Sequence, residues 1–362
     1  MASGPPAKTD GIGVTSPKDI NEEANAARRA PCCPDPNFPT MNGNAPDPVK
    51  REPIPCVICV GGSATIDHIF LVDEVKLPSA KITARDFVET GGGMGANAAV
   101  AVQRLGGRAI YWGRVGDDQT GDEVLWLLTH EGIDVSDVRR LAGFRTKIAS
   151  ILIDSRGERL AVSAQPQGYP PDASWLPVDR VAEANAVLAD TRWPTGAQRL
   201  FEAAMQSKLP SVFDGDGGDP AQVATTARQC THPFYSQPML ASFGYGSPEQ
   251  ALPRVFGGCN VVAGVTLGSS GVMWFDGDRL HTMPSPRVKA VDTLAAGDTW
   301  HGSMALALAE GRSTEAAIEF ASAVAALKCT RFGGRASIPR RDEFERWWSE
   351  QKAGVAPAHV TE

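Results

Sequence analysis

The chain has 362 residues, a formal net charge of −7 at pH 7 and a sequence pI of about 5.5. This length allows one large domain or two smaller ones. The acidic balance and the lack of a long basic run in the sequence argue against a nucleic-acid partner. No apolar run reaches the roughly 18 residues that a membrane span requires, and the seven scattered cysteines predict reduced thiols in a cytoplasmic protein.

The first part of the sequence, residues 1–52, is rich in Pro, Gly, Ala, Asn and charged residues and has few large aliphatic side chains. Such a segment cannot bury a core, so we expect a disordered N-terminal extension. Acids are interspersed with its basic residues and it has no apolar signal segment, which argues against a targeting peptide. We expect the folded domain over residues 53–350 and a C-terminal tail over residues 351–362.

From residue 55 the sequence alternates between short apolar runs and helical patterns. A first buried strand is predicted over residues 56–60. Its C-x-x-C pattern is interpreted as part of that strand, because no second cysteine pair lies near it. Two alternating stretches follow over residues 69–72 and 81–88, and then a helix over 96–105, a strand over 108–112 and a helix over 122–131.

Two polar, alternating strands are predicted over residues 147–154 and 158–163, and the Ser-Arg-Gly sequence between them predicts a hairpin with one exposed face. Further strands are expected over residues 186–189, 211–214 and 259–265 and around 274–275, and Ala-rich helices over 297–310 and 314–328. Short apolar strands that alternate with helices predict a three-layer α/β fold with a mostly parallel central sheet. The polar strands do not fit that sheet, and they predict a small β-strand lid within residues 66–90 and 145–165.

The stretch from residue 291 to 306 combines features that suit phosphate chemistry. Asp292 follows a short apolar strand, a run of tiny residues comes next, and Asp298 opens a helix. Unpaired amides at a helix start attract anions, and tiny side chains let a phosphate approach them closely. A carboxylate at the same place suits the removal of a proton. The pattern therefore predicts phosphoryl transfer to an alcohol, although Asp298 could also be a plain helix cap.

The glycine-rich run over residues 91–96 formally matches the dinucleotide-binding pattern G-x-G-x-x-A. The segment before it is charged and alternating rather than a buried strand, and the acid expected after the next strand is poorly placed, so a dehydrogenase is disfavoured. Four glycines followed by Asn97 instead favour a loop whose backbone meets a polar ligand.

Two sequence motifs together resemble a known family. The run GGMGANAA over residues 92–99, with Gly106 and Gly116 at matching spacing, resembles the N-terminal signature of the PfkB (ribokinase-like) carbohydrate kinases. The run DTLAAGD over residues 292–298 resembles their C-terminal D-T-x-G-A-G-D signature. The resemblance covers residues 55–348. It implies a three-layer ribokinase-like α/β fold with a small lid, and the phosphorylation of a hydroxyl with ATP and Mg²⁺ as cofactors.

The resemblance also implies roles for individual residues. Asp298 would be the general base, and the backbone amides before it would hold the transferring phosphoryl group: Ala295, Ala296 and Gly297. The implied sugar-binding residues are Asp67, Gly92, Gly93 and Asn97, and the implied nucleotide-binding residues are Thr266, Gly268 and Gly271. The plain alternatives are a turn residue for Asp67 and a helix cap for Asn97.

Three departures from the family pattern stand out. Ala295 replaces the first glycine of G-A-G-D, which would cost roughly 1–2 kcal/mol if that position needs a positive φ. Ser303 replaces the usual Gly or Ala after Gly302. The N-x-x-E motif that orders magnesium-bound water has no clear match, because residues 235–238 read Y-S-Q-P. We therefore assign no metal ligand in the chain.

Within the family, phrases at residues 189–193, 213–216 and 326–339 resemble those of the sulfofructose kinases, which phosphorylate the 1-hydroxyl of 6-deoxy-6-sulfofructose. Such a ketose carries a fixed anion, so its site needs a cation. Lys81 and Arg192 match positions of that kind. The plain alternative for both side chains is a solvated surface position.

Several interpretations remain open at the level of sequence. The acceptor could be a sulfonated ketose, fructose, ribose, a sugar acid or a nucleoside. A non-catalytic relative that binds a sugar or a nucleotide is the alternative from another class. The expected partners are a small-molecule sugar and ATP, and the exposed alternating hairpin is compatible with a homodimer through the lid.

Overall fold

The computed structural model describes residues 53–75, 81–154, 159–164, 168–257 and 261–353 of the chain. These residues belong to one compact unit, Pro53–Glu362. The predicted extension, residues 1–52, lies outside the described residues, as do the turn of the predicted hairpin and residues 354–362 of the predicted tail. The tail was predicted to begin too early, because the last helix, α10, runs over Arg341–Lys352.

Eight strands form the central sheet in the order β14-β13-β12-β11-β10-β9-β1-β4. They are β1 (Cys56–Val60), β4 (Arg108–Trp112), β9 (Ala186–Asp190), β10 (Ser211–Gly215), β11 (His232–Ser236), β12 (Ala263–Thr266), β13 (Val272–Phe275) and β14 (Leu280–Met283). The strands from β12 to β4 pair in parallel, whereas β13 and β14 run antiparallel at one edge. This is the mostly parallel sheet that the sequence predicted.

Two parts of this sheet differ from the sequence prediction. Strand β11 was missed because His232 and Pro233 interrupt the short apolar pattern, although Phe234 and Tyr235 are fully buried. Residues 259 and 260 of the strand predicted over 259–265 lie outside the described residues, and β12 covers Ala263–Thr266. Strand β11 matters for the site, because the family's magnesium motif was expected at its carboxyl end.

Successive residues of the central strands face two separate cores, as in a sheet covered on both sides. Helices α2 (Met94–Arg104), α8 (Ala296–Ala309) and α9 (Thr314–Lys328) cover one face, and α4 (Pro194–Gln206), α5 (Pro220–Ala227) and α7 (Pro248–Phe256) cover the other. Cys59 belongs to the first core and Cys56 to the second. Neither forms a disulfide, so the interpretation of C-x-x-C as a strand is confirmed.

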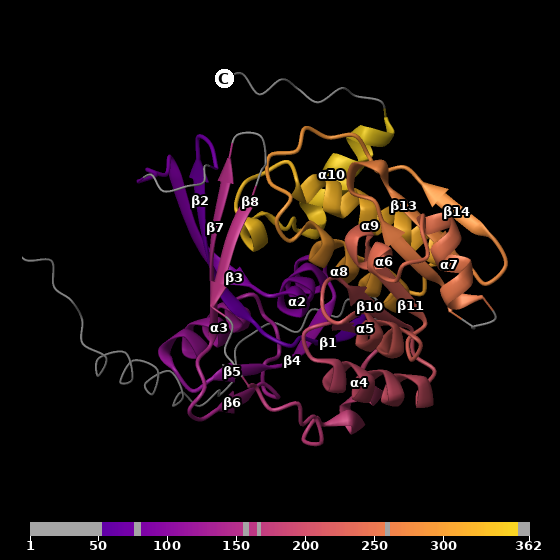
Figure 1. Ribbon diagram of the computed structural model, residues 1–362, viewed down its shortest axis with the longest axis horizontal. Helices are drawn as coiled ribbons and strands as arrows, with labels where there is room; N and C mark the ends of the chain where they lie inside the picture. The colour runs from indigo at the N-terminus through magenta and orange to yellow at the C-terminus, as the bar shows by residue number, and fades with distance from the viewer. Residues whose placement is uncertain (1–52, 76–80, 155–158, 165–167, 258–260, 354–362) are drawn as a thin grey trace, which may run out of the picture. The chain divides into compact units, whose positions relative to one another are not determined.

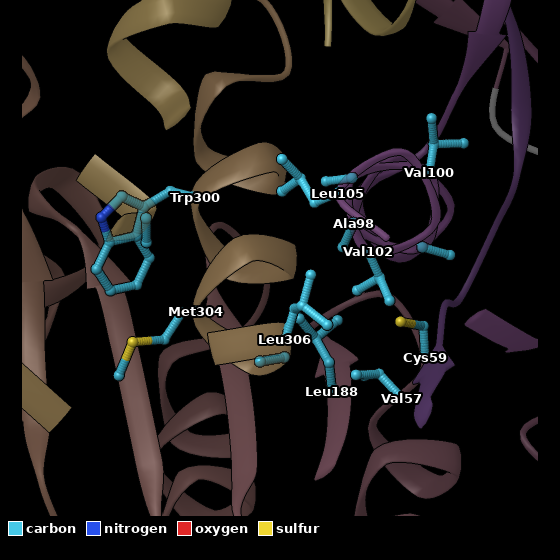
Figure 2. Packing of buried hydrophobic residues seen from close by; sticks show 14 of the residues in the cluster. Val57, Cys59, Ala98, Val100, Val102, Leu105, Leu188, Trp300, Met304 and Leu306 are labelled. Atoms are coloured by element: carbon cyan, nitrogen blue, oxygen red, sulfur yellow. The ribbon is translucent and has the colours of Figure 1, made fainter. Parts of the chain in front are cut away.

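Figure 2 shows the first core, where Val57, Cys59 and Leu188 of the sheet meet Val102 of α2 and Leu306 of α8. The two helices approach closely because Gly302 of α8 lies against α2. A β-carbon at Gly302 would lie 2.4 Å from the backbone oxygen of Ala98. This close crossing brings the start of α2 next to the start of α8.

The remaining elements flank this core: α3 (Gln119–His130), α6 (Gln237–Ser242), the 3₁₀ turns η1 (Val178–Glu183), η2 (Gly268–Ser270) and η3 (Gly334–Ser337), and the small sheet of β5 (Arg114–Gly116) and β6 (Arg139–Leu141). Among the helices of the described ranges, none combines the length and the apolar character needed to cross a membrane.

Four strands form the separate lid sheet, in the order β3-β2-β7-β8. They are β2 (Thr65–Val72), β3 (Asp86–Gly92), β7 (Lys147–Asp154) and β8 (Arg159–Ala164), drawn in indigo and magenta in Figure 1. The strand predicted over residues 81–88 lies later in the chain, because β3 continues into the glycines that begin the glycine-rich run. That extension joins the lid directly to α2.

The register gives the lid two different faces. Asp67, Ile69, Lys147 and Ile151 lie on one face, because Thr65 pairs with Lys147, Asp67 with Ala149 and Ile69 with Ile151. On this inner face Ile69, Ile151 and Ile153 form a small buried cluster against Leu294 and Phe332. The inner face of the lid therefore covers the segment that leads into α8.

Candidate active site

The start of α8 has the backbone conformation that the tiny residues suggested. Ala295 is the N-cap in the left-handed region, with φ 61° and ψ 14°, and α8 begins at Ala296. Among the described residues, Lys208 is the only other non-glycine residue with positive φ. An alanine in this conformation costs roughly 1–2 kcal/mol. The backbone is therefore strained at the residue directly before α8.

The backbone amides of this turn differ in whether they are free to donate a hydrogen bond to an anion. The N–H of Ala296 donates to the carbonyl of Thr293, with an N–O distance of 3.2 Å. The N–H groups of Ala295 and Gly297 have no acceptor among the residues that the structure describes. Two of the three amides implied for phosphoryl binding are thus unpaired at the positive end of the α8 dipole.

A cavity of about 460 Å³ opens beside this helix start. The three residues predicted to bind the nucleotide line it, together with Thr293, Ala296 and Gly297 of the phosphate turn: Thr266, Gly268 and Gly271. Its remaining walls are mainly apolar and include Val272, Trp300, Ala325 and Ala326. An apolar cavity that ends at unpaired amides suits a flat base at one end and a phosphate chain at the other.

Asp298 lies in the first turn of α8 and is half-buried. Its Oδ2 accepts a hydrogen bond from Nδ2 of Asn97 at 2.6 Å. Burial, followed by the neighbouring carboxyl of Asp214, raises the pKa of Asp298 to about 7, against the opposing effect of the Asn97 hydrogen bond. A carboxylate with this proton affinity suits a general base that works near neutral pH.

Asp67 lies close to Gly92 and Gly93, the glycines that are predicted with it to bind the sugar. Thr65 donates from Oγ1 to Oδ1 of Asp67 at 2.7 Å, and burial raises the pKa of the Asp67 carboxyl. A β-carbon at Gly92 would lie 2.1 Å from Oδ2 of Asp67. Gly93 has φ 96°, and a β-carbon there would lie 2.2 Å from the carbonyl oxygen of Ser63. Only glycine fits at either position.

Asp190 is a buried acid that was not among the predicted site residues, and it bonds three backbone segments at the ends of neighbouring strands. Asp190, at the end of β9, accepts hydrogen bonds from the backbone N–H groups of Gly62, Gly95 and Arg192. Burial raises its pKa, and these three bonds oppose that effect. Asp190 therefore fixes the loop after β1, the start of α2 and the loop that carries Arg192.

The predicted pair of cations was Lys81 and Arg192, but the cation close to Arg192 is Lys147. Arg192 is exposed, and a β-carbon at Gly217 would lie 3.1 Å from its Nη1. Lys147 lies on the inner lid face beside Asp67. Burial and then the charge of Arg192 lower the pKa of Lys147, which indicates that the two cations are close. Lys81 is instead exposed in the segment before β3, not on a lid strand as predicted.

A second residue that sequence reasoning missed is Arg335 of η3, which is 4% exposed. Its Nε donates to Oδ1 of Asn97 at 2.7 Å, and its Nη2 donates to the carbonyl of Gly92 at 2.6 Å. The conspicuous phrase over residues 326–339 contains Arg335, but nothing local in the sequence relates it to Asn97.

Asp292, the other acid of the C-terminal motif, is a structural residue. It is buried, and its Oδ2 accepts hydrogen bonds from the N–H groups of Gly333 and Gly334, while its Oδ1 accepts from Leu294. Lys328 is buried beside it and donates from Nζ to its backbone oxygen at 3.0 Å. Asp292 thus joins the phosphate turn to the segment that carries Arg335.

The segment that corresponds to the family's magnesium motif, residues 235–238, contains no acid. No three His, Cys, Asp or Glu side chains gather as a metal site in the part of the chain that the structure describes. Where the family motif was expected, Ser236 ends β11 and caps α6, accepting from the Met239 N–H at 3.4 Å. Mg²⁺ usually keeps several waters and binds through one or two carboxylates together with substrate phosphates.

Comparison with known proteins identifies this architecture. Residues 57–341 match the model of the pfkB family carbohydrate kinases. The chain is 27% identical over 290 residues to the ribokinase of Bacillus subtilis, covering 80% of this chain and 98% of that protein. It is 26% identical over 324 residues to fructokinase-1 of Oryza sativa, covering 78% of this chain and 94% of that protein.

Solved structures agree with this result. A protein from Agrobacterium tumefaciens that is assigned as a ribokinase matches with a TM-score of 0.76 and 36% identity, covering 82% of this chain and 99% of that one. The ribokinase of Thermotoga maritima matches with a TM-score of 0.68 and 26% identity, with the same coverage. The chain therefore belongs to the pfkB family of carbohydrate kinases and is a phosphotransferase with an alcohol group as acceptor.

Proposed function

We propose that this kinase transfers the γ-phosphoryl group of ATP to a primary hydroxyl of a ketose-type sugar that carries an anionic group, such as 6-deoxy-6-sulfofructose. The observation that carries the proposal is the position of Asp298. Its carboxylate lies at the start of α8, where the nucleotide cavity ends, and it is bonded to Asn97 at 2.6 Å. This position supports a role for Asp298 as a base that acts between a phosphate site and a sugar site.

In the proposed reaction the sugar hydroxyl attacks the γ-phosphorus of ATP. The new bond joins the sugar oxygen to phosphorus, the bond to the bridging oxygen breaks, and ADP leaves. The hydroxyl proton passes to the Asp298 carboxylate. The unpaired amides of Ala295 and Gly297 stabilise the negative charge on the transferring group, which is a major contribution in phosphoryl transfer. Magnesium bound with ATP would supply charge neutralisation at the transferring phosphate, and no residue of the chain is assigned as its ligand.

The sugar site supports an acceptor with a hydroxyl face and an anionic end. Asp67, Asn97 and the backbone of Gly92 and Gly93 offer hydrogen bonds to hydroxyl groups. Neither Arg192 nor Lys147 has a side-chain hydrogen bond or an ion pair with another described residue. The charge of Arg192 lowers the pKa of Lys147 although Asp67 and Asp190 act in the opposite direction. An anion between the two cations would offset their repulsion. Lys81 remains a further predicted contact.

An ADP-release screen tests the proposal. The panel is 6-deoxy-6-sulfofructose, fructose, ribose, 2-keto-3-deoxygluconate and adenosine, with Mg²⁺ and ATP. We expect turnover that is fastest with an anionic ketose and is abolished by Asp298→Asn. Asp278→Asn, which changes an exposed acid in the β13–β14 turn, is the matched control. Faster turnover of ribose, fructose or adenosine would refute the anionic acceptor, and binding without turnover would refute catalysis.

A further inference from the structure

Arg335 is held in place before any ligand arrives. Its own backbone oxygen, and those of Ala336 and Ile338, accept hydrogen bonds from Nη1 of Arg104, which lies at the end of α2. On its other side, the preceding N–H groups of Gly333 and Gly334 donate to the Asp292 carboxylate. The guanidinium therefore projects from a turn fixed at both ends.

The guanidinium fits a narrow space under the glycine-rich strand. A β-carbon at Gly91 would lie 1.9 Å from Nη1 of Arg335. Nη2 donates to the carbonyl of Gly92, and Nε donates to Oδ1 of Asn97. A planar group with donors in a fixed fork can satisfy both acceptors at once, which a lysine ammonium on a flexible stem cannot do with the same geometry.

This contact decides which way the Asn97 amide faces. A guanidinium has only donors, so it accepts no hydrogen bond from an amide NH₂ group. The oxygen of Asn97 must therefore face Arg335, and Nδ2 must face Asp298. If the amide were turned over, its oxygen would face the carboxylate oxygen of Asp298, which is repulsive whenever the carboxylate is ionised.

We propose that Arg335 is a positioning residue for the kinase reaction: it fixes the Asn97 amide so that its N–H donor holds the Asp298 carboxylate in place for proton removal. The inference deepens the proposed function and rests on it for the role of Asp298 as the base. The chain of contacts runs from η3 through α2 to α8. It links a turn near the end of the domain to the reacting carboxyl without Arg335 touching that carboxyl.

Loss of Arg335 should also make Asp298 harder to ionise, because a hydrogen bond and a positive charge would both be lost or weakened. Other groups act on this carboxyl from the elements around it, and they stay in place in the variants below: Asp190 of β9, Asp214 of β10, His301 of α8 and Lys328 of α9. The pH at which activity rises should therefore move upward when Arg335 is replaced.

A double-mutant cycle tests the link. Arg335→Met, Asn97→Ala and the double variant are assayed with ATP, Mg²⁺ and the sugar that the wild-type enzyme turns over fastest. We expect Arg335→Met to lower kcat by about tenfold or more, as for the loss of a hydrogen bond to a charged group. In the Asn97→Ala background the same change should lower kcat by less than about twofold, since the residues act as one unit. Independent, multiplying losses would overturn the proposal.

Two variants guard against a purely structural explanation. Arg331→Met is the matched control, because Arg331 lies just before η3, donates to the Ser337 carbonyl and pairs with Glu343 on the surface. It should leave kcat and the pH profile unchanged. Arg335→Lys, which keeps the charge, replaces Arg335→Met if the latter does not fold. It should also lower kcat. A wild-type kcat in Arg335→Lys would show that the planar guanidinium group is not required.

A substrate-free measurement separates this proposal from the proposed function. The difference in melting temperature between the wild type and Asp298→Asn, followed from pH 5 to 9, reports the pKa of Asp298 in the folded protein. The same difference is measured between Arg335→Met and Arg335→Met/Asp298→Asn. A higher pKa of Asp298 without Arg335 supports the positioning role even if no sugar is phosphorylated. An unchanged pKa overturns it even if the kinase is active.

Discussion

The amide Nδ2 of Asn97 lies 2.6 Å from Oδ2 of Asp298, although 201 positions separate the two residues in the chain. The contact joins the two motifs that carry the family resemblance. It is possible because α2 and α8 cross closely at Ala98 and Gly302, one residue after Asn97 and one helical turn after Asp298. The crossing therefore brings the residues predicted to bind the sugar next to those predicted to bind the phosphate.

Replacing Asp298 by Asn should lower kcat by roughly 10²–10⁴, the usual loss when a general base is removed. The amide keeps the shape of the side chain but cannot accept the hydroxyl proton. Steady-state ADP release measures the effect, and circular dichroism checks that the variant is folded. A loss of less than fivefold would mean that another group removes the proton.

Activity should rise with pH through neutrality. Because burial raises the pKa of Asp298 to about 7, a large fraction of this carboxyl is protonated below that pH and cannot act as a base. The expected pH profile of kcat therefore has an acid limb near pH 7. Asn97→Ala should move that limb to higher pH, since it removes the hydrogen bond that lowers this pKa. A flat profile between pH 5.5 and 8 would contradict this assignment.

The same raised pKa affects stability with the opposite sign. The folded state binds the Asp298 proton more tightly than the unfolded chain does. The resulting stabilisation is fully present below the unfolded pKa, near 3.8, and is lost as the pH rises through about 7. The melting temperature of Asp298→Asn relative to the wild type should therefore increase from pH 5 to pH 8, in a thermal-shift series without ligand.

Arg192→Ala and Lys147→Ala should each raise the KM for an anionic acceptor by about tenfold or more, because each removes a charged hydrogen-bond donor. The KM for a neutral acceptor such as fructose should change little. Arg279→Ala, which removes an exposed cation in the β13–β14 turn, is the matched control. Equal losses for charged and neutral acceptors would show that these cations do not recognise an anion.

Ala295→Gly should leave the protein equally stable or stabilise it by up to about 1.5 kcal/mol. The change removes a left-handed strain of roughly 1–2 kcal/mol and adds roughly 0.5–1 kcal/mol of unfolded-state entropy. Urea denaturation measures the free energy of unfolding. Clear destabilisation would mean that the Ala295 methyl group contributes packing that outweighs the strain.

The outer face of the lid predicts self-association. Phe87, Ile148 and Val162 lie on that face and are 48%, 40% and 64% exposed. Apolar groups exposed together on a sheet are typical of an interface. Light scattering at micromolar concentration should detect a dimer, and Phe87→Glu with Val162→Glu should make it monomeric. A wild-type protein that is monomeric at high micromolar concentration would contradict the prediction.

Local sequence patterns were sufficient to predict the bounds of several strands and helices whose burial determines their composition. The strands over residues 56–60 and 108–112 were predicted with the observed bounds, because strands buried on both faces are almost entirely apolar. The helix over residues 314–328 was also predicted with its observed bounds. Strand β11 was missed because its His and Pro interrupt a short apolar segment. The strand predicted over residues 81–88 was displaced because the glycines at the end of β3 suggest a loop.

The sequence alone determined which two loops are predicted to carry the chemistry, because tiny residues before an acid and glycines before an asparagine are local requirements for close approach to a ligand. Only the tertiary structure decided how those loops are joined. The contacts of Arg335 with Asn97 and of Asp190 with three loops, and the position of Lys147 beside Asp67, depend on helix crossing and strand register. Such contacts form between residues far apart in the chain, so no local pattern of residue types encodes them.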